Sequence, residues 1–191
     1  MTTGGPGASP SRNSRVLLHV CCAPDATVPW PEMTAEGHEV DGFFFGSNIH
    51  PLGEWLLRRD AVLKLAGIIG AGVEITPYDP GSWSSAVARD RRASQEGGTG
   101  CAVCFDLQLS AAARFAAERG YDGLCTTLTI SPHKDPGLIN GIGARASARA
   151  GVTWIERVWR KRDGFKISVA RSAEFGLYRQ KYCGCVYSER R

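Results

Sequence analysis

Three close pairs of cysteines are the residues of this chain best suited to chemistry. Cys21 and Cys22 are adjacent, Cys183 and Cys185 are two positions apart, and Cys101 and Cys104 are three positions apart. A C-x-x-C motif at the start of a helix places two thiolates on one side, where the helix dipole and free amide groups lower their pKa. A glycine between two cysteines allows a tight turn in which both sulfurs converge. Three such pairs in one small chain predict a shared metal centre.

The number of thiolates leaves two arrangements open. Six thiolates exceed the ligands of one tetrahedral zinc ion, and they exceed the four protein ligands of one iron–sulfur cluster. Either a cluster uses four and the other two form a redox or substrate-facing pair, or two metal centres share all six. In the second case Asp25 supplies an oxygen ligand to the harder metal, and an iron with mixed ligands keeps an open position for substrate. The alternative role of Asp25 is that of a helix N-cap.

Length and composition predict one domain in a reducing compartment. The 191 residues are 43% hydrophobic, which suits one domain over residues 15–191. Residues 1–14 are rich in Gly, Pro and Ser, and we expect a disordered leader without the apolar region of a secretory signal. No apolar stretch has the length of a membrane span, so we expect a cytoplasmic protein. The seventh cysteine, Cys125, lies within the apolar segment GLCTT and is expected in the core.

The elements that must position these residues alternate between strands and helices. Predicted strands cover 15–20, 40–45, 73–76, 123–127 and 152–155, and predicted helices cover 52–70, 82–93, 101–119, 137–150 and 167–175. Residues 26–36 contain Pro29 and Pro31, which predict a short or irregular crossover. The alternation indicates an α/β protein with a doubly wound, mostly parallel sheet, followed by a C-terminal helical segment that contains cysteines.

Polar residues follow the predicted strands, at the edge where such folds bind ligands. They are Cys21, Cys22 and Asp25 after the first strand, Asn48 and His50 after the second, Tyr78 and Asp79 after the third, and Thr129, Ser131 and His133 after the fourth. The sequence therefore places the candidate site beyond the carboxyl ends of the strands.

Five segments resemble the epoxyqueuosine reductase family of the QueH type. They are HVCCAPD, GFFFGSNIHP, CAVCFDL, TTLTISPHKD and GLYRQKYCGC, and the resemblance runs from about residue 15 to residue 188. It implies a fold like the adenine nucleotide alpha-hydrolases (HUP). It also implies removal of the epoxide oxygen from epoxyqueuosine at the tRNA wobble position, giving queuosine and water, with electrons from an unidentified donor.

The resemblance further implies a [4Fe-4S] cluster and an adjacent single metal ion, taken to be iron. The implied ligands are the six paired cysteines and Asp25, with the division between the two centres left open. Two positions depart from the family pattern, because Gly100 and Asp106 stand where arginines are usual. A contact to substrate or nucleic acid is therefore altered or supplied elsewhere.

The residues around these motifs give the expected catalytic and tRNA-binding sets. We expect Asp25, His133 and Tyr182 to be catalytic, with His133 favoured as the proton donor over His50, Tyr78 and Tyr182. A structural hydrogen bond or simple packing is the alternative for each His and Tyr. The residues expected to contact substrate or tRNA are His50, Lys134, Arg160, Lys161, Arg162, Lys166 and Arg179, with Lys181 beside them.

The last quarter of the chain is strongly basic, which suits a nucleic-acid partner. Residues 145–191 carry twelve Lys and Arg against four Asp and Glu. Within them the stretch RVWRKRDGFK, at 157–166, interleaves Trp159 and Phe165 with five cations, so cations face phosphates and aromatic rings face a splayed base. The alternative is a charged turn anchored by two core aromatic residues.

Three other functions are compatible with parts of this sequence. An ATP-using enzyme of the same fold needs a glycine-rich phosphate loop after the first strand, and the loop here reads CCAPD. A thiol–disulfide oxidoreductase built on Cys101 and Cys104 leaves four paired cysteines unexplained. A non-catalytic, metal-stabilised tRNA-binding module is the remaining alternative. The oligomeric state does not follow from the sequence.

Overall fold

A five-stranded parallel sheet forms the centre of the molecule. The computed structural model describes residues 13–87 and 98–188. The strands are β1 (Arg15–His19), β2 (Glu39–Phe44), β3 (Val73–Ile75), β4 (Gly123–Thr126) and β5 (Thr153–Trp154). Their order is β3-β2-β1-β4-β5, and each pair of neighbours is parallel. The strand order reverses between β1 and β4, which is where doubly wound folds bind their ligands.

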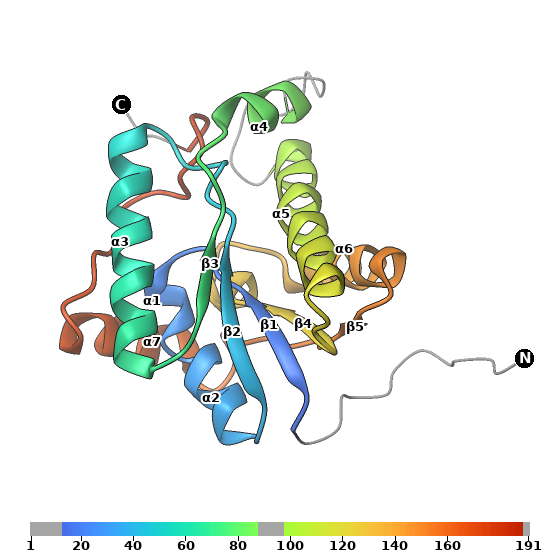
Figure 1. Cartoon of the computed structure of the whole chain (residues 1–191). Helices are drawn as coiled ribbons and strands as arrows, with labels where there is room; N and C mark the ends of the chain where they lie inside the picture. The colour runs from blue at the N-terminus through green and yellow to red at the C-terminus, as the bar shows by residue number, and fades with distance from the viewer. Residues whose placement is uncertain (1–12, 88–97, 189–191) are drawn as a thin grey trace, which may run out of the picture.

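Helices cover both faces of this sheet (Figure 1). They are α1 (Ala23–Ala26), α2 (Pro29–Ala35), α3 (Leu52–Ile69), α4 (Pro80–Val87), α5 (Thr99–Glu118), α6 (Pro136–Ala150) and α7 (Gly164–Glu174), with a 3-10 turn at Leu128–Ile130. The first three helices and α7 lie on one face, and α5 and α6 lie on the other. The predicted α/β fold with a mostly parallel sheet is therefore confirmed.

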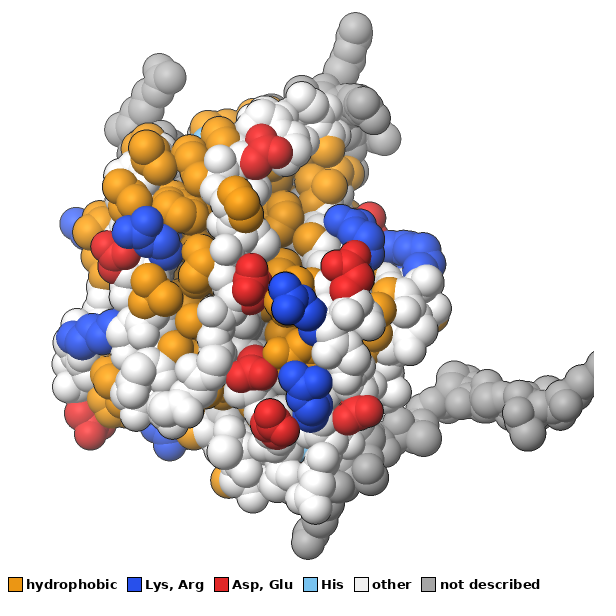
Figure 2. Space-filling model, in the orientation of Figure 1, with side chains coloured by type: hydrophobic (Ala, Val, Ile, Leu, Met, Phe, Trp, Pro, Cys, Tyr) orange, Lys and Arg blue, Asp and Glu red, His pale blue; other side chains and the backbone are white. Residues whose placement is uncertain are grey.

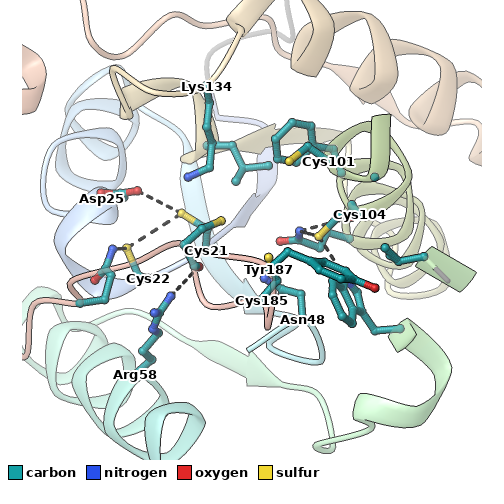
Figure 3. A pocket seen from close by; sticks show the side chains of 18 residues that line it. Cys21, Cys22, Asp25, Asn48, Arg58, Cys101, Cys104, Lys134, Cys185 and Tyr187 are labelled. Atoms are coloured by element: carbon teal, nitrogen blue, oxygen red, sulfur yellow. Dashed lines mark hydrogen bonds between the residues drawn. The ribbon is translucent and has the colours of Figure 1, made fainter. Parts of the chain in front are cut away.

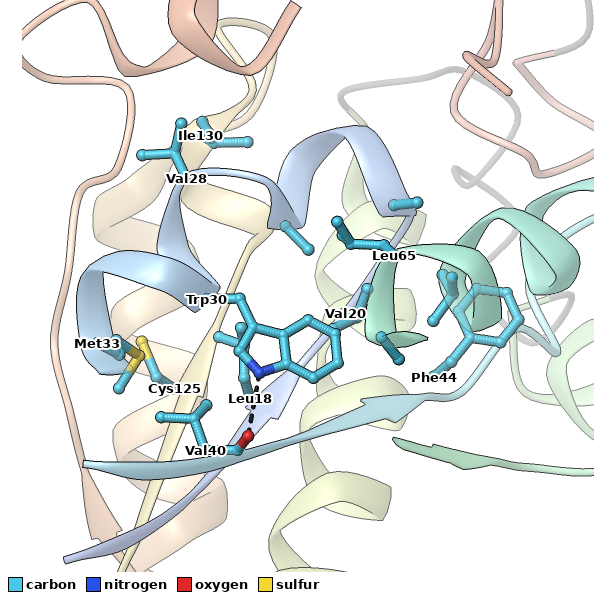
Figure 4. Close-up of a cluster of buried hydrophobic side chains, with 14 of the residues drawn as sticks. Leu18, Val20, Val28, Trp30, Met33, Val40, Phe44, Leu65, Cys125 and Ile130 are labelled. Atoms are coloured by element: carbon cyan, nitrogen blue, oxygen red, sulfur yellow. Dashed lines mark hydrogen bonds between the residues drawn. The ribbon is translucent and has the colours of Figure 1, made fainter. Parts of the chain in front are cut away.

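Alternate side chains of β1 supply the two halves of the core. Leu18 packs with Trp30 of α2 on one face, whereas Leu17 packs with Leu109 of α5 on the other. The indole Nε1 of Trp30 donates to the carbonyl of Val40 at 3.0 Å, so its polar group is satisfied inside the core (Figure 4). Cys125 lies in the same cluster with 1% exposure, as the sequence predicted.

The crossover between β1 and β2 is more regular than its prolines predicted. The seven-residue helix α2 begins at Pro29 and includes Pro31. Both prolines lie in its first turn, where backbone N–H groups have no partner within the helix and a proline costs little. Of the two alternatives predicted for 26–36, the irregular crossover is wrong for this reason, whereas the short one agrees with the seven residues of α2.

Most element boundaries lie within two residues of the predicted ones. Helix α7 begins at Gly164, three residues before the predicted start, after Asp163 in a left-handed conformation with φ of 60°. Helix α4 covers Pro80–Val87, and the predicted continuation to residue 93 lies outside the described residues. The predicted leader lies outside them as far as residue 12. Within the described ranges, no helix is both long and apolar enough to span a bilayer.

Candidate metal centre

All six paired cysteines line one cavity at the carboxyl ends of the strands (Figure 3). They come from three segments far apart in the sequence. Cys21 and Cys22 follow β1, Cys101 and Cys104 lie in the first turns of α5, and Cys183 and Cys185 belong to the loop after α7. Asp25 lines the same cavity, whereas Cys125 lies in the core.

The turn after β1 brings together two sulfurs and one carboxylate. Cys22 takes the N-cap position of α1 in an extended conformation, and Asp25 follows in the first helical turn. The Sγ atoms of Cys21 and Cys22 are 4.0 Å apart, and the Cys21 thiol donates to Oδ2 of Asp25 at 3.2 Å. The three ligand atoms lie within 4.8 Å of one another. Since Cys22 takes the N-cap position, the alternative N-cap role of Asp25 is wrong.

Neighbouring polar groups point at these two sulfurs. The hydroxyl of Thr127 donates to Sγ of Cys21 at 3.3 Å, and Nε2 of Gln180 donates to Sγ of Cys22 at 2.8 Å. Donors aimed at sulfur stabilise a thiolate. Neither Thr127 nor Gln180 was predicted to have a role, although they lie in the segments TTLTISPHKD and GLYRQKYCGC.

Cys104 has a similar arrangement on α5. Nε1 of Trp83 donates to its Sγ at 3.2 Å, and Nε2 of Gln108, one turn further along α5, donates at 3.1 Å. Burial raises the pKa of Cys104 to about 12, although these two donors act in the opposite direction. Burial likewise raises the pKa of Cys22 well above its ordinary value. A metal cation must therefore displace protons when it binds these thiols.

A buried arginine of α3 holds the third ligand segment. Arg58 is 2% exposed, and its guanidinium donates to the carbonyls of Cys183 at 2.8 Å and Tyr182 at 3.0 Å. The same guanidinium pairs with Glu54 at 2.8 Å. Gly184 has φ of +120°, and a Cβ there would lie 2.9 Å from Nη1 of Arg58, so the position requires glycine. The loop is therefore docked on α3 by polar contacts.

Lys134 reaches into the cavity from the loop after β4 (Figure 3). Burial lowers the pKa of Lys134, but the negative charges of Cys183, Cys21 and Asp25 outweigh it and leave this pKa above its ordinary value. The ammonium group therefore places a positive charge beside the candidate ligands Cys21, Asp25 and Cys183. Lys134 was expected to contact substrate or tRNA, and the structure places it at the candidate metal centre.

Two other expected catalytic residues, His133 and Tyr182, lie beside this cavity, together with Arg179, which was expected to contact substrate or tRNA. His133, Arg179 and Tyr182 line a second, larger cavity that adjoins the first. The hydroxyl of Tyr182 donates to the carbonyl of His50. His50 lines neither cavity. Its ring packs on Trp83 with centroids 5.2 Å apart, and its backbone N–H donates to the carbonyl of Gly184.

Most of the basic stretch lies away from the candidate metal centre. Lys161 and Arg162 line a different groove, which they share with the carboxylates of Glu32, Glu36 and Glu156. Lys166 pairs with Asp163 at 3.0 Å, and Arg160 donates to the carbonyl of Lys134 at 3.0 Å. On the face seen in Figure 2, the described Lys and Arg side chains are mixed with Asp and Glu, so no continuous basic patch is present there.

The two aromatic residues of that stretch have different surroundings. Trp159 is 6% exposed, and its indole Nε1 donates to the carbonyl of Thr126 at 3.0 Å. The expectation that it faces a base is therefore wrong, because the core already holds it. Phe165 is half-buried and lines the second cavity.

The two departures from the family pattern have separate places. Gly100 lines the metal cavity in the first turn of α5, where it adds no charge. Asp106 lies further along the helix and pairs with Arg149 at 3.0 Å.

Two solved structures share this fold at low sequence identity. The U34-tRNA thiolase NcsA from Methanococcus maripaludis, described with its [4Fe-4S] cluster, matches with a TM-score of 0.59 and 12% identity over 94% of this chain and 63% of its own. A predicted subunit of tRNA methyltransferase from Methanocaldococcus jannaschii matches with a TM-score of 0.55 and 13% identity, over 81% of this chain and 74% of its own. These matches support the HUP-like fold.

Relatives found by sequence are much more similar to this chain in identity than these two structures are. The protein from Haemophilus influenzae named epoxyqueuosine reductase QueH is 35% identical over 182 residues, which cover 95% of this chain and 74% of that protein. The protein of the same name from Thermotoga maritima is 38% identical over 178 residues, covering 91% of this chain and 89% of its own. The family model described as "Epoxyqueuosine reductase QueH" matches residues 16–191. The chain belongs to the epoxyqueuosine reductase QueH family.

Proposed function

We propose that this chain is an epoxyqueuosine reductase that acts on tRNA. The reaction consumes two electrons and two protons, removes the epoxide oxygen of epoxyqueuosine at the wobble position as water, and leaves queuosine. The observation that carries the proposal is the meeting of six cysteines and Asp25 in one cavity, in a chain of this family. The electrons come from a donor that is not identified.

The donor set fits two metal centres. Cys21, Cys22 and Asp25 would hold the single metal ion, since their ligand atoms lie within 4.8 Å of one another and combine sulfur with oxygen. The four remaining sulfurs match the four ligands of one [4Fe-4S] cluster: Cys101, Cys104, Cys183 and Cys185. When bound, the cluster supplies single electrons and the adjacent metal, taken to be iron, supplies Lewis acidity.

The chain's own residues set the charge of the site and exclude water from it. Lys134 holds a positive charge at the cavity wall, where it stabilises negative charge that develops on the epoxide oxygen. Phe105 and Leu128 contribute apolar wall, which strengthens that interaction by excluding water.

The proton source is proposed on the side of the second cavity. His133 lines that cavity and is exposed, so it can exchange protons with solvent. The hydroxyl proton of Tyr182 is engaged by the carbonyl of His50, which favours a positioning role for this tyrosine over proton donation.

Anaerobic reconstitution followed by a single-turnover assay tests the proposal. Iron and sulfide are quantified, the protein is incubated with epoxyqueuosine-containing tRNA and a chemical reductant, and the nucleosides are analysed by mass spectrometry. We expect the modified nucleoside to lose the mass of one oxygen, and Cys22→Ser to abolish this loss. A fully loaded protein that binds the tRNA but leaves the nucleoside mass unchanged would support the non-catalytic tRNA-binding module instead.

A further inference from the structure

The cavity beside the metal centre differs from it in size. The second cavity has a volume of about 690 Å³, whereas the cavity lined by the cysteines has about 50 Å³. Small-molecule sites in proteins usually have volumes of about 300–1,000 Å³. A nucleoside therefore fits the second cavity and not the first, and only its reacting end can reach the metal ligands.

The two cavities share one wall. Asp25, Lys134, Gln180 and Cys183 line both of them. Oε1 of Gln180 is buried and has no hydrogen-bond partner among the described residues, while its Nε2 is engaged by Cys22. The shared wall thus offers an acceptor to a ligand that carries a hydroxyl or amino donor.

The second cavity also carries the groups that recognise a nucleotide. Three cations, Lys134, Arg179 and Lys181, line it against one carboxylate, Asp25. Both Arg179 and Lys181 are exposed, so they are placed to meet phosphate groups. The half-buried ring of Phe165 lines the same cavity, with the guanidinium of Arg179 centred 5.9 Å from the ring centroid.

We propose that this second cavity binds the wobble nucleotide of a single-stranded anticodon loop, with its base stacked on Phe165 and its flanking phosphates held by Arg179 and Lys181. The epoxide-bearing end then faces the wall formed by Gln180, Lys134 and Asp25. This inference rests on the proposed function and adds the place and mode of substrate binding. It keeps Phe165 of the stretch 157–166 but replaces the cations of that stretch as the main tRNA contact, since they line another groove or pair locally and Trp159 is in the core.

Binding of an anticodon stem-loop RNA carrying epoxyqueuosine tests this proposal directly. The RNA is titrated against reconstituted protein, and affinity is measured by fluorescence anisotropy at several salt concentrations. We expect Phe165→Ala to weaken binding about tenfold, since loss of one stacked base has an effect of this order. Phe165→Tyr keeps a stacking face and should bind as the unsubstituted protein does, which separates stacking from a folding defect.

The cations give a second, independent readout. Arg179→Gln should lower the slope of log affinity against log salt by about 0.7, the value for one phosphate contact to a single strand. The matched control is Arg162→Gln, which removes the same charge from the other groove and should leave both affinity and slope unchanged. Iron content should be the same in every variant, because none of these residues is an expected ligand.

The outcomes separate this inference from the function on which it rests. If the unsubstituted protein removes the oxygen and Phe165→Ala and Arg179→Gln bind the RNA unchanged, the inference is wrong and the function stands. If Arg162→Gln weakens binding and Arg179→Gln does not, the tRNA lies on the basic stretch instead. If RNA binding is tight and depends on Phe165 but the nucleoside loses no oxygen, the proposed function is wrong and the proposed nucleotide site stands.

Discussion

Removal of the buried arginine that docks the third ligand segment should damage both stability and metal uptake. Arg58 is 2% exposed and its partner Glu54 is 9% exposed, so Arg58→Met leaves a buried carboxylate without its cation. Breaking a buried pair from one side costs about 3–5 kcal/mol. The carbonyls of Cys183 and Tyr182 lose charged donors at the same time, so we expect a loss in this range or above it.

The adjacent arginine provides a matched control. Arg59 pairs with Asp60 at 2.7 Å, but these side chains are 32% and 61% exposed. Such surface pairs contribute at most about 1 kcal/mol. Arg59→Met therefore makes the same chemical change one residue away, with little expected effect on the free energy of unfolding.

Urea unfolding of the metal-free protein, followed by tryptophan fluorescence, measures the stability difference. Iron retained after anaerobic reconstitution and desalting measures the second effect, because Arg58 holds the loop that carries Cys183. The double variant Glu54→Leu with Arg58→Met removes the unpaired charge and should recover at least about 1 kcal/mol relative to Arg58→Met. If Arg58→Met lay within about 1 kcal/mol of the unsubstituted protein and took up the same iron, the pair would not hold the loop and the reasoning would be refuted.

Three further predictions concern the metal ligands, the loop that carries Cys183, and Lys134. The Cys22→Ser variant should lose bound iron. The Cys125→Ser variant should keep its iron and its turnover but lose about 1 kcal/mol of stability, since a hydroxyl then replaces a buried thiol. Equal iron loss in both variants would contradict the core position of Cys125. Gly184→Ala places a methyl group 2.9 Å from Arg58 in a backbone conformation that costs a non-glycine residue about 1–3 kcal/mol, and unfolding together with iron content should show both effects. The Lys134→Met variant should lower the rate of oxygen removal by about tenfold or more at unchanged iron content, and Lys134→Arg should restore part of this rate. An unaltered single-turnover rate in Lys134→Met would show that the charge of Lys134 does not stabilise the epoxide oxygen.

The fold follows from local sequence patterns, whereas the meeting of the cysteines was predicted from their occurrence as three pairs and from the family resemblance. Buried apolar runs identify the strands, and the rule that ligands lie beyond the carboxyl ends of parallel strands places the loops after β1 and β4 together. The C-x-x-C motif lies in the first turns of α5, where the alanine-rich segment predicted a helix. Sequence pattern alone was enough for the individual strands and helices, because each of them depends on neighbours in the chain.

The features that the sequence analysis missed depend on segments far apart. Arg58 and Arg59 stand side by side in LLRRD, and only docking of the loop after α7 on α3 buries the first and leaves the second at the surface. Trp159 shows the same limit, because its surroundings come from the end of β4, which lies 33 residues earlier in the chain. The second cavity likewise combines loops after β1 and β4 with α7 and the C-terminal loop.

The turn after β1 explains why this fold suits a cation here and opposes a phosphate group. A helix N-terminus binds anions through free N–H groups in its first turn. Helix α1 has only four residues, Pro24 removes one of these N–H groups, and the carboxylate of Asp25 adds a negative charge in the same turn. Two sulfur atoms and this carboxylate occupy the position instead, with ligand atoms within 4.8 Å of one another. The sequence CCAPD thus disfavours an ATP-using enzyme of this fold for the same reason that it favours a metal centre.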